Sequence, residues 1–118
     1  MTEEKKHHEN ELEKAVELAE EIILLELIDL EEYAKAGKKP QHAKRYRIRI
    51  DKEYKEVSVH EMTGRQILGL VGKTPETYLL SEKFHGGVVE PVKPDQIVKF
   101  HHHAVERFQT LALDPTEG

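Results

Sequence analysis

Apolar side chains recur at helical spacing in the first third of the chain. Leu12, Val16, Ala19, Ile23 and Leu27 follow one another at steps of three or four residues. The residues between them are mostly Glu, Lys, Ala and Leu, which favour helix. The pattern predicts an amphipathic helix that starts near residue 11.

Part of this predicted helix, residues 22–28, is apolar nearly all round. A helix that is apolar on more than one face must be covered on more than one face. One face can dock on the body of the protein, and we expect the other, drawn from Ile23, Leu24, Leu27 and Ile28, to form a self-association surface or to dock in a partner groove. Packing of the helix on its own sheet alone is the alternative. A buried strand is the competing interpretation, because short apolar runs fit either element.

The next residues predict a second, short helix. Asp29 and Glu32 have the spacing of a capping box, which predicts a helix over residues 30–36. Gly37 is a typical residue just beyond a helix end, and Pro40 prevents continuation.

Strict alternation begins at residue 45 and predicts a half-buried strand over residues 45–51. After a tight turn at residues 51–53, residues 54–60 complete a hairpin, with Val57 and Val59 directed inward. The inward positions of the first strand are Tyr46, Ile48 and Ile50. The outward positions form a basic stripe of Arg45, Arg47 and Arg49.

The rest of the chain predicts one more helix and three strands. Thr63 is a plausible N-cap for a two-turn helix that ends at Gly72. Further strands are expected at residues 78–83, 88–90 and about 104–112, with a turn at 85–87. Pro91 and Pro94 are expected to end regular structure after the short strand, and residues 95–100 are expected to form a short turn or strand with one or two core residues.

This order is strand, strand, helix, strand, short strand, strand. It predicts an α+β protein of the β-grasp type, a mixed sheet of four or five strands with one helix across it, preceded by an N-terminal helical extension. The first and last strands run parallel at the centre of such a sheet, so the C-terminus projects from its edge.

Charge divides the chain into unequal parts. Residues 1–37 carry twelve acidic residues against four lysines, a net charge of −8, whereas residues 38–118 carry a net charge of +3. The predicted parts are an acidic helical extension (1–37), a linker (38–44), a ubiquitin-like β-grasp domain (45–113) and a flexible tail (114–118).

Composition excludes several classes. The chain has no cysteine, so it has no disulfide, thiolate nucleophile or cysteine-based zinc site. The longest apolar run covers only four residues, which predicts no membrane span, and the polar start predicts no signal peptide. The weakly basic body does not favour nucleic-acid binding. We expect a cytoplasmic protein with no cofactor.

The C-terminus carries the most distinctive candidate chemistry. The last predicted strand leads into Asp114, Pro115, Thr116 and Glu117, and the chain ends at Gly118. A terminal glycine is small and flexible, so its carboxylate can enter a narrow enzyme channel that a side chain would block. This is the geometry of a protein whose own C-terminus is a substrate.

Two other features invite functional interpretations. Consecutive histidines at 101–103 suggest metal binding, but neighbours on an extended segment point to opposite faces, so at most His101 and His103 converge. No further ligand completes a site, and we expect no metal. The stripe of Arg45, Arg47 and Arg49 is either a solvated strand face or a docking surface for an activating or conjugating enzyme.

Several segments together resemble the bacterial multiubiquitin-domain family. The resemblance is carried by residues 46–52, 62–68, 72–75, 105–111 and 116–118. It implies a ubiquitin-like modifier encoded beside activating, conjugating and deconjugating enzymes, in systems linked to antiphage defence. On this basis Gly118 corresponds to the family's conjugating glycine, and lysines of target proteins are the acceptors.

The resemblance covers roughly residues 29–118, with two departures. Many members carry tandem copies, whereas one copy is present here, and the end is Glu117-Gly118 rather than a glycine pair. The alternative function is a non-conjugated adaptor that binds, or self-associates, through its N-terminal helix. A sulfur carrier shares the fold but generally ends in two glycines. An enzyme is least favoured, because no convergent catalytic residues are evident.

Overall fold

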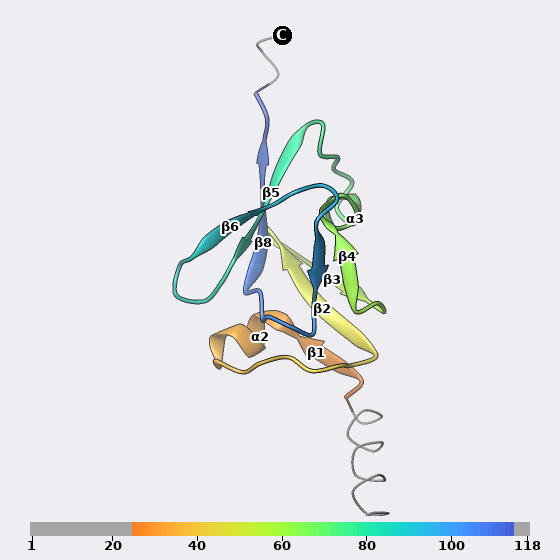
Figure 1. Ribbon diagram of the computed structural model, residues 1–118, viewed down its shortest axis with the longest axis vertical. Coiled ribbons are helices and arrows are strands. Elements are labelled where there is room, and N and C mark those ends of the chain that lie inside the picture. Colours follow the sequence, from red (N-terminus) through yellow and green to blue (C-terminus); the bar gives the residue numbers. More distant parts are fainter. Residues whose placement is uncertain (1–24, 115–118) are drawn as a thin grey trace, which may run out of the picture.

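The structure is a computed structural model, and it describes residues 25–114. Within this range it contains two helices and eight strands (Figure 1). In chain order they are β1 (Leu27–Asp29), α2 (Leu30–Lys35), β2 (Arg45–Ile50), β3 (Glu53–Val57), β4 (Glu61–Thr63), α3 (Gly64–Gly69), β5 (Tyr78–Lys83), β6 (Val89–Val92), β7 (Ile97–Lys99) and β8 (Arg107–Ala112).

The main sheet is mixed, and β8 lies at its centre (Figure 1). β8 is antiparallel to β5 over six residue pairs and parallel to β2 at one pair, Ile50 and Phe108. β6 continues the sheet beyond β5, and β3 continues it beyond β2. This confirms the prediction that the first strand of the domain and the last strand run parallel, with the last strand central.

The β2–β3 hairpin follows the predicted alternation. The inward residues Tyr46, Ile48 and Ile50 are at most 1% exposed. The turn is made by Asp51, whose positive φ of 54° is a conformation that aspartate tolerates better than most residues. Val57 is buried as predicted, but the inward placement of Val59 is wrong. β3 ends at Val57, and the Val59 side chain is 46% exposed.

α3 lies across one end of the sheet and begins with the predicted cap. The Thr63 hydroxyl accepts from the Gln66 amide, and the Gln66 side chain accepts from the Thr63 amide. Ile67 and Leu68 point into the core. Gly64 touches the Lys93 carbonyl so closely that any side chain at this position would clash, which fixes α3 against the loop that leads to β7.

Two features of the second half differ from the prediction. Residues 61–63 form β4, which pairs with β7 in a second, two-stranded sheet that the sequence did not indicate. The predicted break at Pro91 is wrong, because Pro91 lies inside β6. β6 is at the edge of the sheet, where a proline nitrogen has no ladder partner to lose.

The N-terminal prediction is corrected where the structure describes it. The helix predicted to run through Leu27 and Ile28 is wrong there, because residues 27–29 form β1, parallel to the start of β2. The competing strand interpretation is confirmed for this stretch. Residues 1–24 lie outside the described range, so the rest of the predicted helical extension has no support from the structure.

The second predicted helix is confirmed as α2. The Asp29 carboxylate caps it by accepting from the amides of Glu31 and Glu32, and Gly37 follows its end with a φ of 67°. Leu30 and Ala34 are buried, so α2 belongs to the folded body. Neither α2 nor α3 is long and apolar enough to cross a membrane.

Candidate functional site

The C-terminal strand β8 leads directly to the predicted conjugation site. On one side β5 accompanies it to its end, where the Leu113 amide donates to the Thr77 carbonyl at 2.8 Å. On the other side β2 stops early, so only Ile50 pairs with Phe108. The last residues of β8 therefore need another support on that side.

Asp51 supplies this support from the β2–β3 turn. Its amide donates to the Phe108 carbonyl at 2.8 Å, and its carboxylate accepts from the Thr110 amide at 2.9 Å and the Thr110 hydroxyl at 2.6 Å. Burial tends to raise the pKa of Asp51, but the Thr110 hydrogen bonds and the nearby Lys73 ammonium lower it below its usual value. The carboxylate is therefore charged when it holds β8.

Lys73 completes this anchor from the loop after α3. Its ammonium donates to the Thr110 hydroxyl at 2.8 Å, lies 3.4 Å from the Asp51 carboxylate, and sits 4.5 Å from the centre of the Tyr78 ring. Two segments distant in sequence, the β2–β3 turn and the loop after α3, thus converge on Thr110 of β8. The strand is therefore anchored at Thr110. Three residues later, the Leu113 amide still donates to the Thr77 carbonyl, just before β5.

The predicted tail lies mostly beyond the described range. Asp114 is the last described residue and is exposed. Pro115, Thr116, Glu117 and the expected conjugation residue Gly118 fall outside, so their role stays a prediction.

An exposed apolar pair lies beside the start of the tail. Leu79 on β5 and Leu111 on β8 are direct cross-strand partners, and their side chains are 52% and 66% exposed. They point to the outer face of the sheet, opposite to the buried Leu80. Sequence reasoning did not single out this pair. The pattern that could have identified it is a leucine at an outward-facing position in each of two predicted strands.

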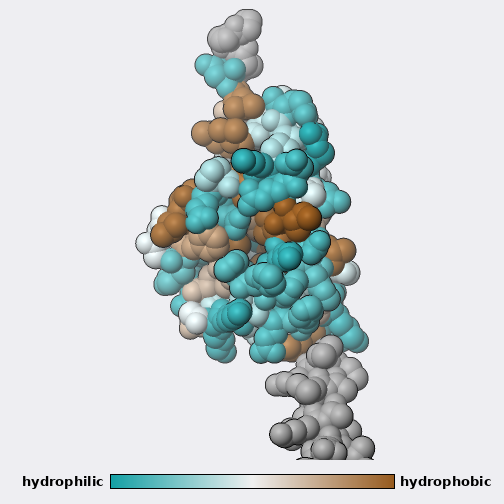
Figure 2. Space-filling view, in the orientation of Figure 1, coloured by the Kyte–Doolittle hydropathy of each residue, from teal (hydrophilic) through white to brown (hydrophobic). Residues whose placement is uncertain are grey.

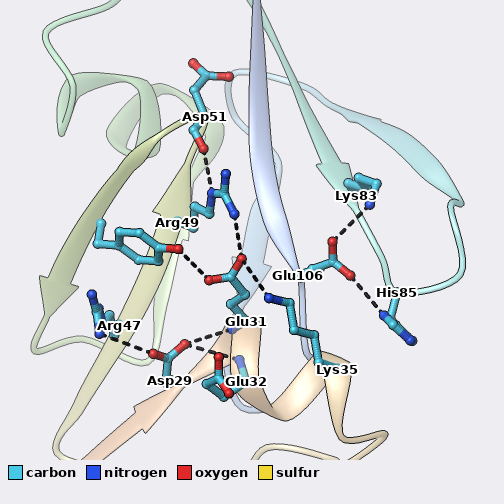
Figure 3. Close-up of polar contacts among 11 residues, drawn as sticks. Asp29, Glu31, Glu32, Lys35, Arg47, Arg49, Asp51, Lys83, His85 and Glu106 are labelled. Carbon is cyan, nitrogen blue, oxygen red and sulfur yellow. Dashed lines mark hydrogen bonds and ion pairs between the residues drawn. The ribbon is translucent and has the colours of Figure 1, made fainter.

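The arginine stripe is engaged within the protein. Arg45 pairs with Glu56 at 2.9 Å, Arg47 lies 3.5 Å from Asp29, and Arg49 donates to Glu31 at 2.7 Å. Figure 3 shows the side chains of Arg47 and Arg49 directed toward the start of α2. A docking partner at this stripe would compete with acids of the chain itself.

Glu31 is the centre of that cluster. Its side chain is 6% exposed and also accepts from the Tyr54 hydroxyl at 2.7 Å. Burial tends to raise the pKa of Glu31, but the hydrogen bonds from Tyr54 and Arg49 lower it. The cluster therefore holds α2 against the β2–β3 hairpin.

Glu106 forms a second paired cluster at the start of β8. It accepts from Lys83 at 2.9 Å and contacts His85 at 3.0 Å (Figure 3). These hydrogen bonds, first from His85 and then from Lys83, lower the pKa of Glu106 to about 2. The tip of the β5–β6 hairpin is thereby tied to the central strand.

The four apolar residues predicted to dock a partner have different environments. Ile23 and Leu24 lie outside the described range. Leu27 is 38% exposed, whereas Ile28 is fully buried beside Tyr46. In this arrangement Ile28 belongs to the core of the domain.

The histidines do not assemble as their order in the sequence suggested. His101 packs against His42 and His60, with ring centres 4.2 and 5.7 Å away. Burial and the neighbouring imidazoles lower the pKa of both His42 and His101. Across residues 25–114, no three or more metal-ligating side chains are grouped in a way that could hold a metal ion.

The mixed sheet, the capped helix across it and the central last strand define a protein of the ubiquitin-like class. A family model described as multiubiquitin matches residues 46–112, more than half of the chain. The chain belongs to the multiubiquitin family, which is a family of ubiquitin-like domains and not of catalytic ones. No curated protein and no solved structure matched it.

Proposed function

We propose that this protein is a conjugated modifier whose Gly118 carboxylate is activated and joined to lysines of target proteins. The observation that carries the proposal is the position of β8 in a domain of the multiubiquitin family. The central strand of the sheet is the last one, and its final residues lead straight into the tail that bears the glycine.

The chemistry requires enzymes supplied in trans. The Gly118 carboxylate attacks the α-phosphorus of ATP, which forms an acyl-adenylate and releases pyrophosphate. An enzyme thiol or hydroxyl then displaces AMP and loses its proton. Finally, a target lysine amine attacks that ester, the enzyme group leaves, and an isopeptide bond forms. A deconjugating peptidase would hydrolyse the same bond.

The anchor at Thr110 supports this proposal physically. Asp51 and Lys73 hold β8 in place. An enzyme that binds the folded domain therefore also fixes the position of the first residue of the tail. Residues 114–118 extend at most about 18 Å when fully stretched. This short tether confines Gly118 near the enzyme's reacting group, which is the contribution that proximity makes to catalysis.

The Leu79–Leu111 pair is a candidate docking surface for the enzyme. The pair is apolar, exposed and close to the start of the tail, whereas the arginine stripe is already paired within the chain. We therefore assign docking of the activating or conjugating enzyme to the leucine pair in preference to Arg45, Arg47 and Arg49.

The test is incubation of the full chain with the activating-type enzyme encoded beside it and ATP, followed by mass spectrometry. We expect an adduct on the terminal carboxylate. Deletion of Gly118, or addition of a bulky residue after it, should abolish the adduct. Leu79→Ser/Leu111→Ser should reduce its rate, and the matched surface change Val59→Ser should not.

Two results would contradict the proposal. An adduct that persists without Gly118 would place the chemistry elsewhere. Partner binding that survives the deletion, with no conjugate in any condition, would favour the non-conjugated adaptor.

A further inference from the structure

A groove lies on the opposite face of the sheet from the leucine pair, between the β5–β6 hairpin and β7. It has a volume of about 450 Å³, within the range of ligand sites in proteins. Its walls include Phe84, Val98 and Val105, and Ile97 stands at its rim with 52% of its side chain exposed. Figure 2 shows hydrophobic surface over β6 on the left and over β7 right of centre on the same face.

The groove is open because the helix is short. α3 has six residues and occupies one end of the sheet, held there by the contact of Gly64 with the loop at Lys93. Within residues 25–114, the other part of this face is lined by the short strand β7 and by the segment around His103. The half of the sheet made by β5 and β6 therefore has an accessible inner surface.

Two glutamates line this groove, the partly buried Glu82 on β5 and the exposed Glu90 on β6. They are direct cross-strand partners, so their Cβ atoms lie about 5 Å apart on one face of the sheet. Burial first, and the charge of Glu90 second, raise the pKa of Glu82. Among residues 25–114, none of the ion pairs or side-chain hydrogen bonds includes either glutamate.

Two basic side chains of the chain, Lys99 and His103, also line the groove, but neither forms an ion pair with Glu82 or Glu90. Residues 1–24 carry eight acidic residues against three lysines, so their net charge does not complement two carboxylates. A groove that combines the apolar side chains of Phe84, Ile97, Val98 and Val105 with two unpaired carboxylates is complementary to a cation carried on an aliphatic stem.

We propose that this groove binds an extended segment of a partner protein that places a lysine or arginine side chain between Glu82 and Glu90. Aliphatic neighbours of that cation pack against Phe84 and Ile97. The stem of a lysine or arginine suits such a site, because its methylenes can cover apolar walls while its charged end reaches the carboxylates. This interface is independent of the proposed conjugation, since it lies on the other face of the sheet.

The experiment uses the full ¹⁵N-labelled chain and short acetylated, amidated peptides. The probe is Ala-Val-Lys-Val-Ala, and the two comparison peptides carry glutamate or norleucine in place of the lysine. We expect amide shifts confined to β5, β6 and residues 96–103 with the lysine peptide, and much weaker binding of the other two. The double variant Glu82→Gln/Glu90→Gln should lower the affinity at least about tenfold.

A charge-matched control is the double variant Glu53→Gln/Glu76→Gln, which removes two exposed acids outside the groove. It should bind the lysine peptide as the unchanged protein does. Equal loss in both double variants, shifts that map to another surface, or no shifts at millimolar peptide would overturn the proposal. Spectra of the variants without peptide verify that each remains folded.

Discussion

The glutamate at the start of α2 and the two glutamates in the groove differ in both burial and pairing. Glu31 is almost inaccessible and has both Arg49 and Tyr54 as partners at 2.7 Å. Glu82 is partly buried, has no ion-pair partner, and has the exposed Glu90 as its cross-strand partner. A buried carboxylate is stable when it is paired and unfavourable when it is not. The difference suggests that the first cluster serves folding and the second serves binding.

The largest effect is expected from Glu31→Ala. This change leaves the Arg49 guanidinium and the Tyr54 hydroxyl without their common acceptor, beneath α2. We expect the free energy of unfolding to fall by about 2–3 kcal/mol, measured by urea denaturation. Glu32→Ala, in the same helix but outside the cluster around Arg49, should change it by less than about 0.5 kcal/mol. Equal effects of the two variants would show that the cluster contributes nothing specific.

The next effect concerns Glu106 and depends on pH. Its pKa is about 2 in the folded protein, against an ordinary value of 4.5, so its charge stabilises the fold fully above pH 4.5 and loses this effect as the pH falls toward 2. Glu106→Gln should cost about 1–2 kcal/mol at pH 7 and progressively less below pH 4.5.

Urea denaturation at several pH values from 3 to 7 measures this difference. The control is Glu56→Gln, which weakens the exposed pair with Arg45 and should cost less than about 0.5 kcal/mol. A loss for Glu106→Gln that does not change with pH would show that packing, and not charge, is responsible.

The parts of the fold that depend on local pattern could be predicted from the sequence. Alternation identified β2 and its buried residues, and Thr63 as an N-cap identified the start of α3. The central, parallel position of β8 followed from the order of elements. Each of these features is encoded within a few neighbouring residues or in the order of the elements.

The parts that failed depend on contacts between distant residues. Ile28 lies in an apolar run that suits a helix, but pairing with Tyr46 makes it a strand. Arg49 appears free in an alternating strand, yet its partner Glu31 comes from an element eighteen residues earlier. The Asp51–Thr110 anchor requires the tertiary fold in the same way. No local pattern carries such information.

A smaller effect is expected at the anchor of β8. Asp51→Asn keeps an oxygen that can accept from the Thr110 amide but removes the charge that attracts the Lys73 ammonium. We expect a local loss of about 1 kcal/mol, which corresponds to roughly fivefold faster hydrogen exchange at the Thr110 amide. Asp95→Asn, in the exposed loop before β7, should leave this exchange rate unchanged. If both variants exchange alike, Asp51 does not hold the strand.

The smallest effect, and the one of opposite sign, is expected in the groove. Glu82→Gln removes a charge that has no counterion and faces Glu90, so the variant should equal the original protein in stability or exceed it by less than about 0.5 kcal/mol at pH 7. Because the pKa of Glu82 is raised, the original carboxyl becomes neutral as the pH falls toward its ordinary value of 4.5, and the gain should vanish there. Urea denaturation at pH 7 and pH 4 measures both points. A clear destabilisation at pH 7 would mean that Glu82 has a stabilising partner, and the contrast with Glu31 would then disappear.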